Sequence, residues 1–208
     1  MRILKLSILF LVFLSTTSVL AQKKVELYRS MSDYLQNKYD TVNGIIIEKR
    51  THGQIYMVGG NDYKILSSNK TLNKSLKREV WAVNSHDSLY INCFHFQLGL
   101  WYAYAEQIND NLYFTAAITM DKEERQRIAM MGVVGGPIAA GLSGGALALE
   151  RYYYFLNLNT GQSHYLTKAN MLEIIGAFPD LVDKYKLEKE PESIDTLRFY
   201  LAEFKKRK

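Results

Sequence analysis

The chain has 208 residues, with 26 Lys and Arg against 21 Asp and Glu, and 48% of its residues are hydrophobic. This apolar fraction excludes a disordered chain, and a content of three Pro and 13 Gly excludes a collagen-like or Pro-rich protein. The length suits one compact domain with a core of its own. A single Cys allows no disulfide within the chain.

The first 21 residues carry the pattern of a secretory signal. Arg2 and Lys5 form a basic head, an apolar run covers residues 6–14, and the small residue Ala21 suits cleavage before Gln22. An uncleaved membrane anchor is the alternative, but the run is shorter than the roughly 20 residues that span a bilayer. We expect an exported protein, periplasmic, associated with the outer envelope or secreted, in which residues 22–208 form one mature domain.

Two basic stretches remain after the signal is removed. The loss of Arg2 and Lys5 lowers the net charge, so the composition gives little support for a nucleic-acid partner. The stretches either touch an anionic lipid or an acidic glycan, or they are a solvated face and a frayed terminus. They comprise Lys64, Lys70, Lys74, Lys77 and Arg78, and the tail 205–208.

The first elements expected in the mature chain are a short helix and a series of strands. Residues 25–38 form an amphipathic piece in which Ser32 can cap a short helix. Short turns between the strands favour antiparallel hairpins, and Leu72 and Leu76, four residues apart, indicate one surface helix. The predicted strands are the β-branched or aromatic runs 44–47, 54–58, 62–66, 79–83, 89–91, 101–105 and 112–116.

The second half of the chain predicts mainly helices. The capping-box spacing of Asp121 and Glu124 starts one helix, and a hairpin of strands 152–158 and 164–166 follows. Three further helices begin at Thr167, Pro179 and Pro191. The last one carries an apolar stripe of Ile194, Leu197, Leu201 and Phe204.

These elements predict an α+β fold. Its antiparallel β-rich body comprises residues 43–119 and 152–166, with a Gly-rich apolar helical segment at 128–149 and a helical C-terminal region at 167–206.

The Gly-rich segment 128–149 has no charged residue and contains six Gly. Small residues recur at every fourth position, a spacing that lets a second helix approach closely in a membrane or a homo-oligomer. Pro137 and the glycines weaken a continuous helix, so two short helices packed internally or a loop are the alternative. The candidate contact residues are Gly132, Gly136, Ala140, Gly144 and Ala148.

Catalytic patterns are few. Cys93 and His95 are two residues apart and would share a face of a strand, as a thiol nucleophile or a metal pair would require. Two ligands do not make a zinc site, however, and Cys93 is favoured as a small core residue. The pair His86 and Asp87 has no nucleophile elbow beside it. We predict no catalytic residue, no cofactor and no metal.

Aromatic residues form the last signal, with 15 Tyr, nine Phe and two Trp. Trp101, Tyr102 and Tyr104 lie in one predicted strand. Aromatic faces with polar tips suit a glycan or a peptide at a wet surface, but they suit half-buried strands equally well. These three residues are the candidate ligand-binding aromatics.

Several short motifs recur along the mature chain: residues 27–38, the Gly-Gly-Asn-Asp-Tyr-Lys run at 59–64, and residues 87–92, 154–161, 166–167 and 178–181. Together they resemble an uncharacterised family of small secreted Bacteroidetes-type proteins. The resemblance implies an envelope or secreted location and carries no reaction, cofactor or catalytic residue.

Two functional hypotheses follow from the sequence. The first is a non-catalytic envelope protein that associates with the membrane or with its own copies through the segment 128–149. The second is a soluble secreted module that binds a glycan or a peptide on its aromatic strands.

Overall fold

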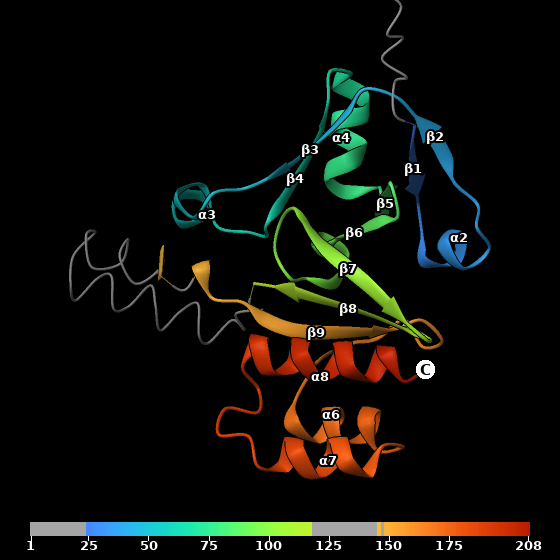
Figure 1. Ribbon diagram of the computed structural model, residues 1–208. Helices are drawn as coiled ribbons and strands as arrows, with labels where there is room; N and C mark the ends of the chain where they lie inside the picture. Colours follow the sequence, from blue (N-terminus) through green and yellow to red (C-terminus); the bar gives the residue numbers. More distant parts are fainter. Residues whose placement is uncertain (1–23, 118–144, 147) are drawn as a thin grey trace, which may run out of the picture.

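A computed structural model of the chain describes residues 24–117, 145–146 and 148–208 (Figure 1). Their strands form one antiparallel sheet, and helices pack on both of its faces, so the predicted α+β class with a β-rich body is confirmed. The strands are β1 (Val25–Tyr28), β2 (Asp40–Val42), β3 (Ile45–Lys49), β4 (Tyr63–Ser67), β5 (Ala82–Ser85), β6 (Ser88–Asn92), β7 (Tyr102–Ile108), β8 (Asn111–Ala116), β9 (Tyr152–Asn157) and β10 (Ser163–Tyr165). The helices are α2 (Met31–Leu35), α3 (His52–Val58), α4 (Lys70–Arg78), the 3₁₀ helix η1 (Cys93–Phe96), α6 (Lys168–Ile175), α7 (Pro179–Lys186) and α8 (Ile194–Lys206).

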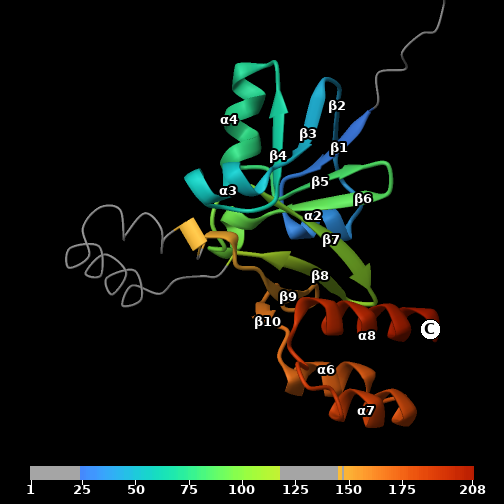
Figure 2. The same ribbon diagram turned by 60° about the vertical axis from the view of Figure 1, so that its left-hand side comes forward.

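The sheet has a main path and one side arm. Its strand order is β10-β9-β8-β7-β6-β5-β1-β2. The β3–β4 hairpin lies off this path and joins it through a single pairing, between Tyr63 and Tyr102. This arm lies beside α4 in both orientations (Figure 1 and Figure 2).

Cross-strand pairing fixes the side chains that share a face, because directly paired residues point the same way. Val83 pairs with Tyr90, Tyr90 pairs with Tyr104, and Glu106 pairs with Tyr113. Alternate positions on β7, such as Ala103 and Ala105, point to the opposite face. We call the face that holds Tyr104 the tyrosine face.

Helices cover the tyrosine face at its two ends. At one end, Leu76 of α4 packs with Val83 and Tyr102. At the other end, α6 to α8 pack with Tyr113, and α8 lies between the sheet and the other two helices (Figure 2). The stretch of β7 around Tyr104 lies between these two packed ends. On the opposite face, α2 and η1 cover the largest core cluster, which contains Phe114.

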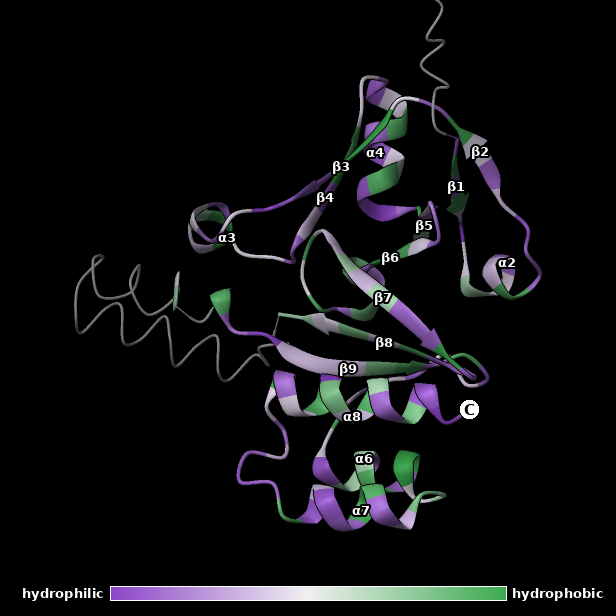
Figure 3. Ribbon diagram, viewed as in Figure 1, coloured by the Kyte–Doolittle hydropathy of each residue, from purple (hydrophilic) through white to green (hydrophobic). Residues whose placement is uncertain are grey.

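Hydropathy explains why these helices lie on the sheet. Leu76 of α4 is buried while its neighbours Lys77 and Arg78 are exposed. On α8, Leu197, Leu201 and Phe204 are buried on one stripe, as predicted. Hydrophilic and hydrophobic bands accordingly alternate along α4 and α8 in Figure 3.

The sequence prediction fails at residues 54–58, which form most of helix α3 and not a strand. Thr51 caps this helix, and its side chain and that of Gln54 form a reciprocal capping box. The apolar run Ile55 to Val58 resembles a strand, but only Ile55 is buried. The capping box therefore outweighed the strand-like composition.

Other differences are smaller. Residues 25–28 and 40–42 are strands that were not predicted, and Ser30 caps α2 where Ser32 was expected. Ser193 caps α8, so this helix begins after the position expected from Pro191. The helices at Thr167 and Pro179 begin where predicted. The helix expected from Asp121 lies outside the described residues.

Two findings bear on the predicted contact with a membrane. Among the described residues, no helix has the length and apolar character that crossing a membrane requires. Gly145, at the described end of the Gly-rich segment, is buried, and a Cβ atom there would lie 2.4 Å from the ring of Tyr56. This part of the segment therefore packs against α3.

Candidate functional site: a tyrosine cleft and a tryptophan cavity

A cleft of about 280 Å³ opens on the tyrosine face between its two packed ends. It has four Tyr and charged groups of both signs in its walls. We call it the tyrosine cleft. Its lining residues are Lys49, Asp62, Tyr63, Tyr104, Glu106, Tyr113, Phe114, Thr115, Tyr153 and Arg198.

The cleft exists because β4 and β8 lie along the same side of β7 at different positions. β4 pairs with β7 at Tyr102, and the pairing with β8 begins at Ala105. β6 occupies the other side of β7 over this stretch. Tyr104 therefore lies where the neighbouring strand changes, and its side chain is 45% exposed.

Asn61 ties together the loops beside this gap. It is fully buried, and its side-chain amide donates to the carbonyls of Leu98 (2.8 Å) and Leu100 (3.1 Å). Its Oδ1 accepts from the backbone N–H of Ala117 at 2.8 Å. This arrangement fixes the loop before β4 against the residue that follows β8.

Charged side chains complete the same cluster. The Nε of Arg151 lies 2.8 Å from Oδ1 of Asp62, and its Nη2 donates to the carbonyl of Gly60. Arg50 is buried and donates to the carbonyls of Gln54, Gly59 and Asn61. Burial lowers the pKa of Arg50, and the neighbouring charge of Arg151 lowers it further. We call Arg50, Gly60, Asn61, Asp62 and Arg151 the polar hub.

The walls of the cleft present aromatic rings together with positively and negatively charged side chains. Tyr63, Tyr90 and Tyr104 form an edge-to-face ladder, with centroid distances of 5.0 and 6.0 Å. Burial raises the pKa of Tyr113 to about 12 and also raises the pKa of Tyr153, so both phenols are hydroxyl groups at neutral pH. Such walls offer stacking surfaces and hydrogen bonds to a polar ligand.

A second hollow, of about 180 Å³, lies between α4 and the start of β7 and shares no lining residue with the tyrosine cleft. It has an apolar floor and two cations at its rim. We call it the Trp101 cavity. Its lining residues are Ile65, Leu76, Lys77, Arg78, Asn92, Leu100, Trp101 and Tyr102.

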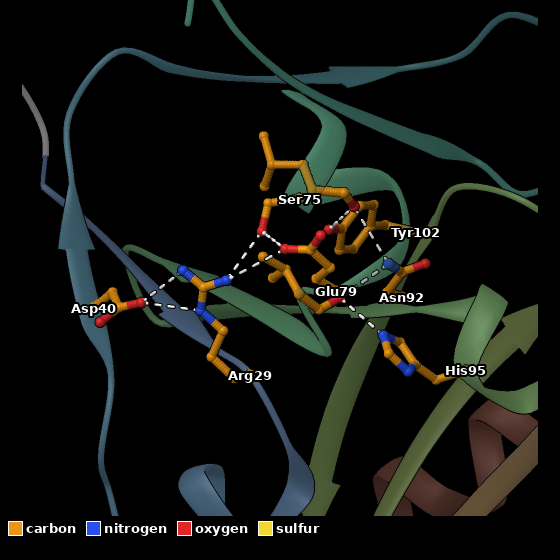
Figure 4. Close-up of polar contacts among 9 residues, drawn as sticks. Arg29, Asp40, Ser75, Glu79, Asn92, His95 and Tyr102 are labelled. Carbon is orange, nitrogen blue, oxygen red and sulfur yellow. Dashed lines mark hydrogen bonds and ion pairs between the residues drawn. The ribbon is translucent and has the colours of Figure 1, made fainter. Parts of the chain in front are cut away.

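Buried polar groups fix the wall of this cavity, as Figure 4 shows. The Tyr102 hydroxyl donates to the carbonyl of Leu76 at 2.6 Å. The Asn92 amide donates to the carbonyl of Val80 at 2.9 Å, and it lies 3.3 Å from the carbonyl of Leu76 and 3.4 Å from that of Lys77. His95 Nε2 is 3.2 Å from the Val80 carbonyl. Two carbonyls in the last turn of α4, those of Leu76 and Lys77, thus accept hydrogen bonds from side chains of other elements.

A surface network holds the other side of α4. Arg29 donates to the carboxylate of Asp40 and to the hydroxyl of Ser75, and Ser75 donates to Glu79 (Figure 4). About half of the Arg29 side chain is exposed, so each ion pair contributes little stability. The network serves to orient α4 against β1 and β2.

The three candidate aromatics are divided between the two hollows. Tyr104 lines the tyrosine cleft, and Trp101 and Tyr102 line the Trp101 cavity. Tyr102 is 1% exposed, so it belongs to the core and contributes only to a wall. Trp101 precedes β7 with a φ of +76°, an unusual value for a bulky side chain. The three candidate aromatics therefore line two separate hollows.

Most of the candidate Gly-rich contact residues lie outside the described residues, namely Gly132, Gly136, Ala140 and Gly144. Ala148 is half-buried, and its carbonyl accepts a hydrogen bond of 2.8 Å from Nη1 of Arg151. It is thus held by the polar hub.

The Cys93 and His95 pair does not share a strand face, because both residues lie in the 3₁₀ helix η1. Cys93 is buried, and desolvation raises the pKa of its thiol, which opposes a thiolate nucleophile. His86 lies in the exposed turn between β5 and β6, where the Ser85 hydroxyl is 2.9 Å from its Nδ1. Within the described ranges, no three His, Cys, Asp or Glu side chains gather closely enough to hold a metal ion.

The polar hub is the feature that sequence reasoning missed. The run Gly59 to Lys64 enters the sequence analysis only as a motif that resembles a family and as part of a turn between strands. A buried Asn side chain that bonds to several loops leaves no periodic pattern in the sequence. The one available signal was the pair of glycines beside two short polar residues, a composition typical of a constrained turn.

Residues 26–208 match the model of a family of unknown function, DUF6563. The chain belongs to this family. Neither the curated proteins nor the solved structures contain a match to the chain. The family covers both hollows and the polar hub, and its description assigns no activity to them.

Proposed function

We propose that this member of DUF6563 is a non-catalytic binding module of the cell envelope, which holds a glycan or a peptide in the tyrosine cleft. The observation that supports this function is the gap between β4 and β8, where exposed Tyr104 stands among charges of both signs. A concave site with aromatic walls and a few fixed polar groups is the usual form of a ligand site.

The cleft suits a polar ligand more than a lipid. Glu106 contacts Lys205 of α8, and Asp62 is bonded to Arg151, so their carboxylates are positioned before any ligand arrives. Carboxylate oxygens accept hydrogen bonds from hydroxyl or amide groups, and phenols both donate and accept. Sugars and peptides supply both kinds of partner along a flat or extended shape.

Binding can be tested on the mature chain by nuclear magnetic resonance titration. The probes are maltopentaose, triacetylchitotriose and a mixture of random hexapeptides. We expect one probe class to shift the signals of residues that line the cleft. We also expect Tyr104→Ala to weaken that binding by about tenfold, because an exposed aromatic wall acts as a hot spot.

Tyr39→Ala is the matched control, because Tyr39 is similarly exposed and lies outside the cleft. Shifts confined to residues outside the cleft, or equal losses in the two variants, would contradict the proposal. The hexapeptide arm separates a peptide ligand from a glycan.

The envelope location rests on residues 1–21, whose pattern is that of a cleaved signal, and on the resemblance to secreted Bacteroidetes-type proteins. N-terminal sequencing of the protein from the envelope fraction is expected to begin at Gln22. A full-length cytosolic product would contradict export. Association through the segment 128–149 stays a prediction, since four of its five candidate residues lie outside the described part of the chain.

A further inference from the structure

Trp101 is held in one position by several independent contacts. The Cζ of Arg50 and the Nζ of Lys64 each lie 5.6 Å from the centroid of the Trp101 ring, within cation–π range. Gly60 makes room for the ring, because a Cβ at that position would lie 2.7 Å from Cδ1 of Trp101. The left-handed backbone of Trp101 is thus stabilised by its surroundings, and strained residues of this kind are concentrated at ligand sites.

The indole of Trp101 also has an unused donor. Its Nε1 is buried, and no hydrogen-bond partner lies near it among the described residues. A buried N–H without a partner is energetically unfavourable. Trp101 itself lines the cavity, so its ring supplies an aromatic wall to an occupant.

The rim of the Trp101 cavity is cationic. Lys77 and Arg78 are exposed, neither makes an ion pair within the described residues, and no acidic residue lines the cavity. Cations at a helix C-terminus are often explained by its unpaired carbonyls. In α4 the carbonyls of Leu76 and Lys77 accept hydrogen bonds from Tyr102 and Asn92, and no acidic side chain in the lining of the cavity neutralises the rim.

The interior of the cavity is apolar and small. Ile65 and Leu76 form its floor, and Leu100 lies at the mouth with 49% exposure. The volume of about 180 Å³ is below the range of roughly 300–1,000 Å³ for sites that hold drug-sized ligands. An occupant of this size has one short alkyl chain or one ring.

We propose that the Trp101 cavity binds a small amphiphilic carboxylate. The apolar chain of the ligand packs on Ile65, Leu76 and Trp101, and its carboxylate lies at the rim against Lys77 and Arg78. Arg78 is suited to this contact, because a guanidinium binds a carboxylate through two parallel hydrogen bonds. This site is independent of the tyrosine cleft, so either proposal can fail alone.

Isothermal titration calorimetry on the mature chain tests this site with three probes that share an eight-carbon chain: octanoate, octanol and octylamine. We expect octanoate to bind with one site per chain, octanol to bind more weakly, and octylamine not to bind. Arg78→Gln is expected to raise the Kd of octanoate by about tenfold through the loss of a charged hydrogen-bond pair. Leu100→Trp is expected to abolish binding by filling the mouth.

Lys70→Gln is the matched control, because it removes one positive charge from the same helix outside the cavity. It is expected to leave the Kd of octanoate within about twofold at physiological salt, since exposed charges are screened there. Equal losses in Arg78→Gln and Lys70→Gln would overturn the proposal in favour of general charge attraction. Equal binding of octanol and octanoate would also overturn it.

A carboxylate amphiphile has the same general chemistry as an anionic lipid in a bilayer, so a second arm separates the two sources. The chain is mixed with vesicles of phosphatidylglycerol and with vesicles of phosphatidylcholine. Octanoate binding without retention on either vesicle supports a free ligand. Retention on phosphatidylglycerol without octanoate binding overturns the cavity proposal and assigns the basic face of α4 to a membrane surface.

Discussion

The two sides of the tyrosine cleft are stabilised by different physical means. At the helical end, α6, α7 and α8 bury Leu197, Leu201 and Phe204 in a cluster that is almost wholly apolar. At the other side of the cleft, the polar hub holds β4 against β8 with buried Asn and Arg side chains that bond to backbone groups. Apolar packing tolerates changes of shape, whereas a buried polar group must keep every partner.

The difference matters for binding, because the two sides form the walls of the tyrosine cleft. Arg198 of α8 supplies one wall and Asp62 of the hub supplies the other. The hub sets where the strands separate, and the helical layer closes the cleft from the side. We therefore expect hub substitutions to change the shape of the cleft and helical substitutions to change mainly the stability of the domain.

The largest effect is expected from Asn61→Ala. This change leaves the buried Leu98 carbonyl and the Ala117 N–H without their partner, at about 1–3 kcal/mol for each. We expect a loss of about 2–6 kcal/mol in the free energy of unfolding, measured by urea denaturation. The exposed Asn159→Ala is the control, with a change within about 0.5 kcal/mol. Similar values for the two variants would show that the hub is dispensable.

A comparable but purely apolar loss is expected from Leu201→Ala at the helical end. Leu201 is 3% exposed, and Leu→Ala changes in a core cost about 2–5 kcal/mol. Phe199→Ala on the same helix removes a side chain that is 56% exposed and serves as the control. Urea denaturation measures both. If Leu201→Ala also shifts the amide signals of residues beside the cleft, the separation of roles between the two ends is wrong.

The same contrast explains how much of the fold the sequence could predict. The helical end follows from local patterns, since Thr167 and Pro179 mark helix starts and Leu197, Leu201 and Phe204 recur at helical spacing. Helix α3 was missed because its apolar run has the composition of a strand, and only the Thr51 and Gln54 pairing identifies it. The spacing of Thr51 and Gln54 is itself a local helix signal, so α3 was missed because strand-like composition was weighed above the capping box.

The candidate site was predicted only in part, for a related reason. Tyr104 was identified as a ligand-binding aromatic and does line a cleft, but Tyr102, two residues away on the same face, is buried under α4. The alternation of residues along a strand predicts which side chains share a face, but it does not predict which other element covers that face. The cleft depends on where β4 and β8 pair along β7, and such long-range strand pairing has no signature within a short window of sequence.

The smallest effect is expected at alkaline pH, where the helical end has an ionisable weakness of its own. The Tyr185 hydroxyl donates to the carbonyl of Pro191 at 2.8 Å, and burial raises the pKa of Tyr185 to about 12, with the neighbouring carboxylate of Glu192 acting in the same direction. An unfolded Tyr titrates near 10. The unfolded chain therefore loses this proton first, and the stability that the raised pKa contributes is complete below pH 10 and is lost as the pH rises from about 10 to about 12.

Tyr185→Phe removes the hydrogen bond, so it should lower stability by about 1 kcal/mol at pH 7, but it should also reduce the decline between pH 10 and 12. The measurement is the urea midpoint of both proteins across this range. Phe199→Leu, which changes the same helical layer without an ionisable group, should decline as the original protein does, and a Tyr185→Phe curve that stays parallel to the original would disprove the role of this phenol.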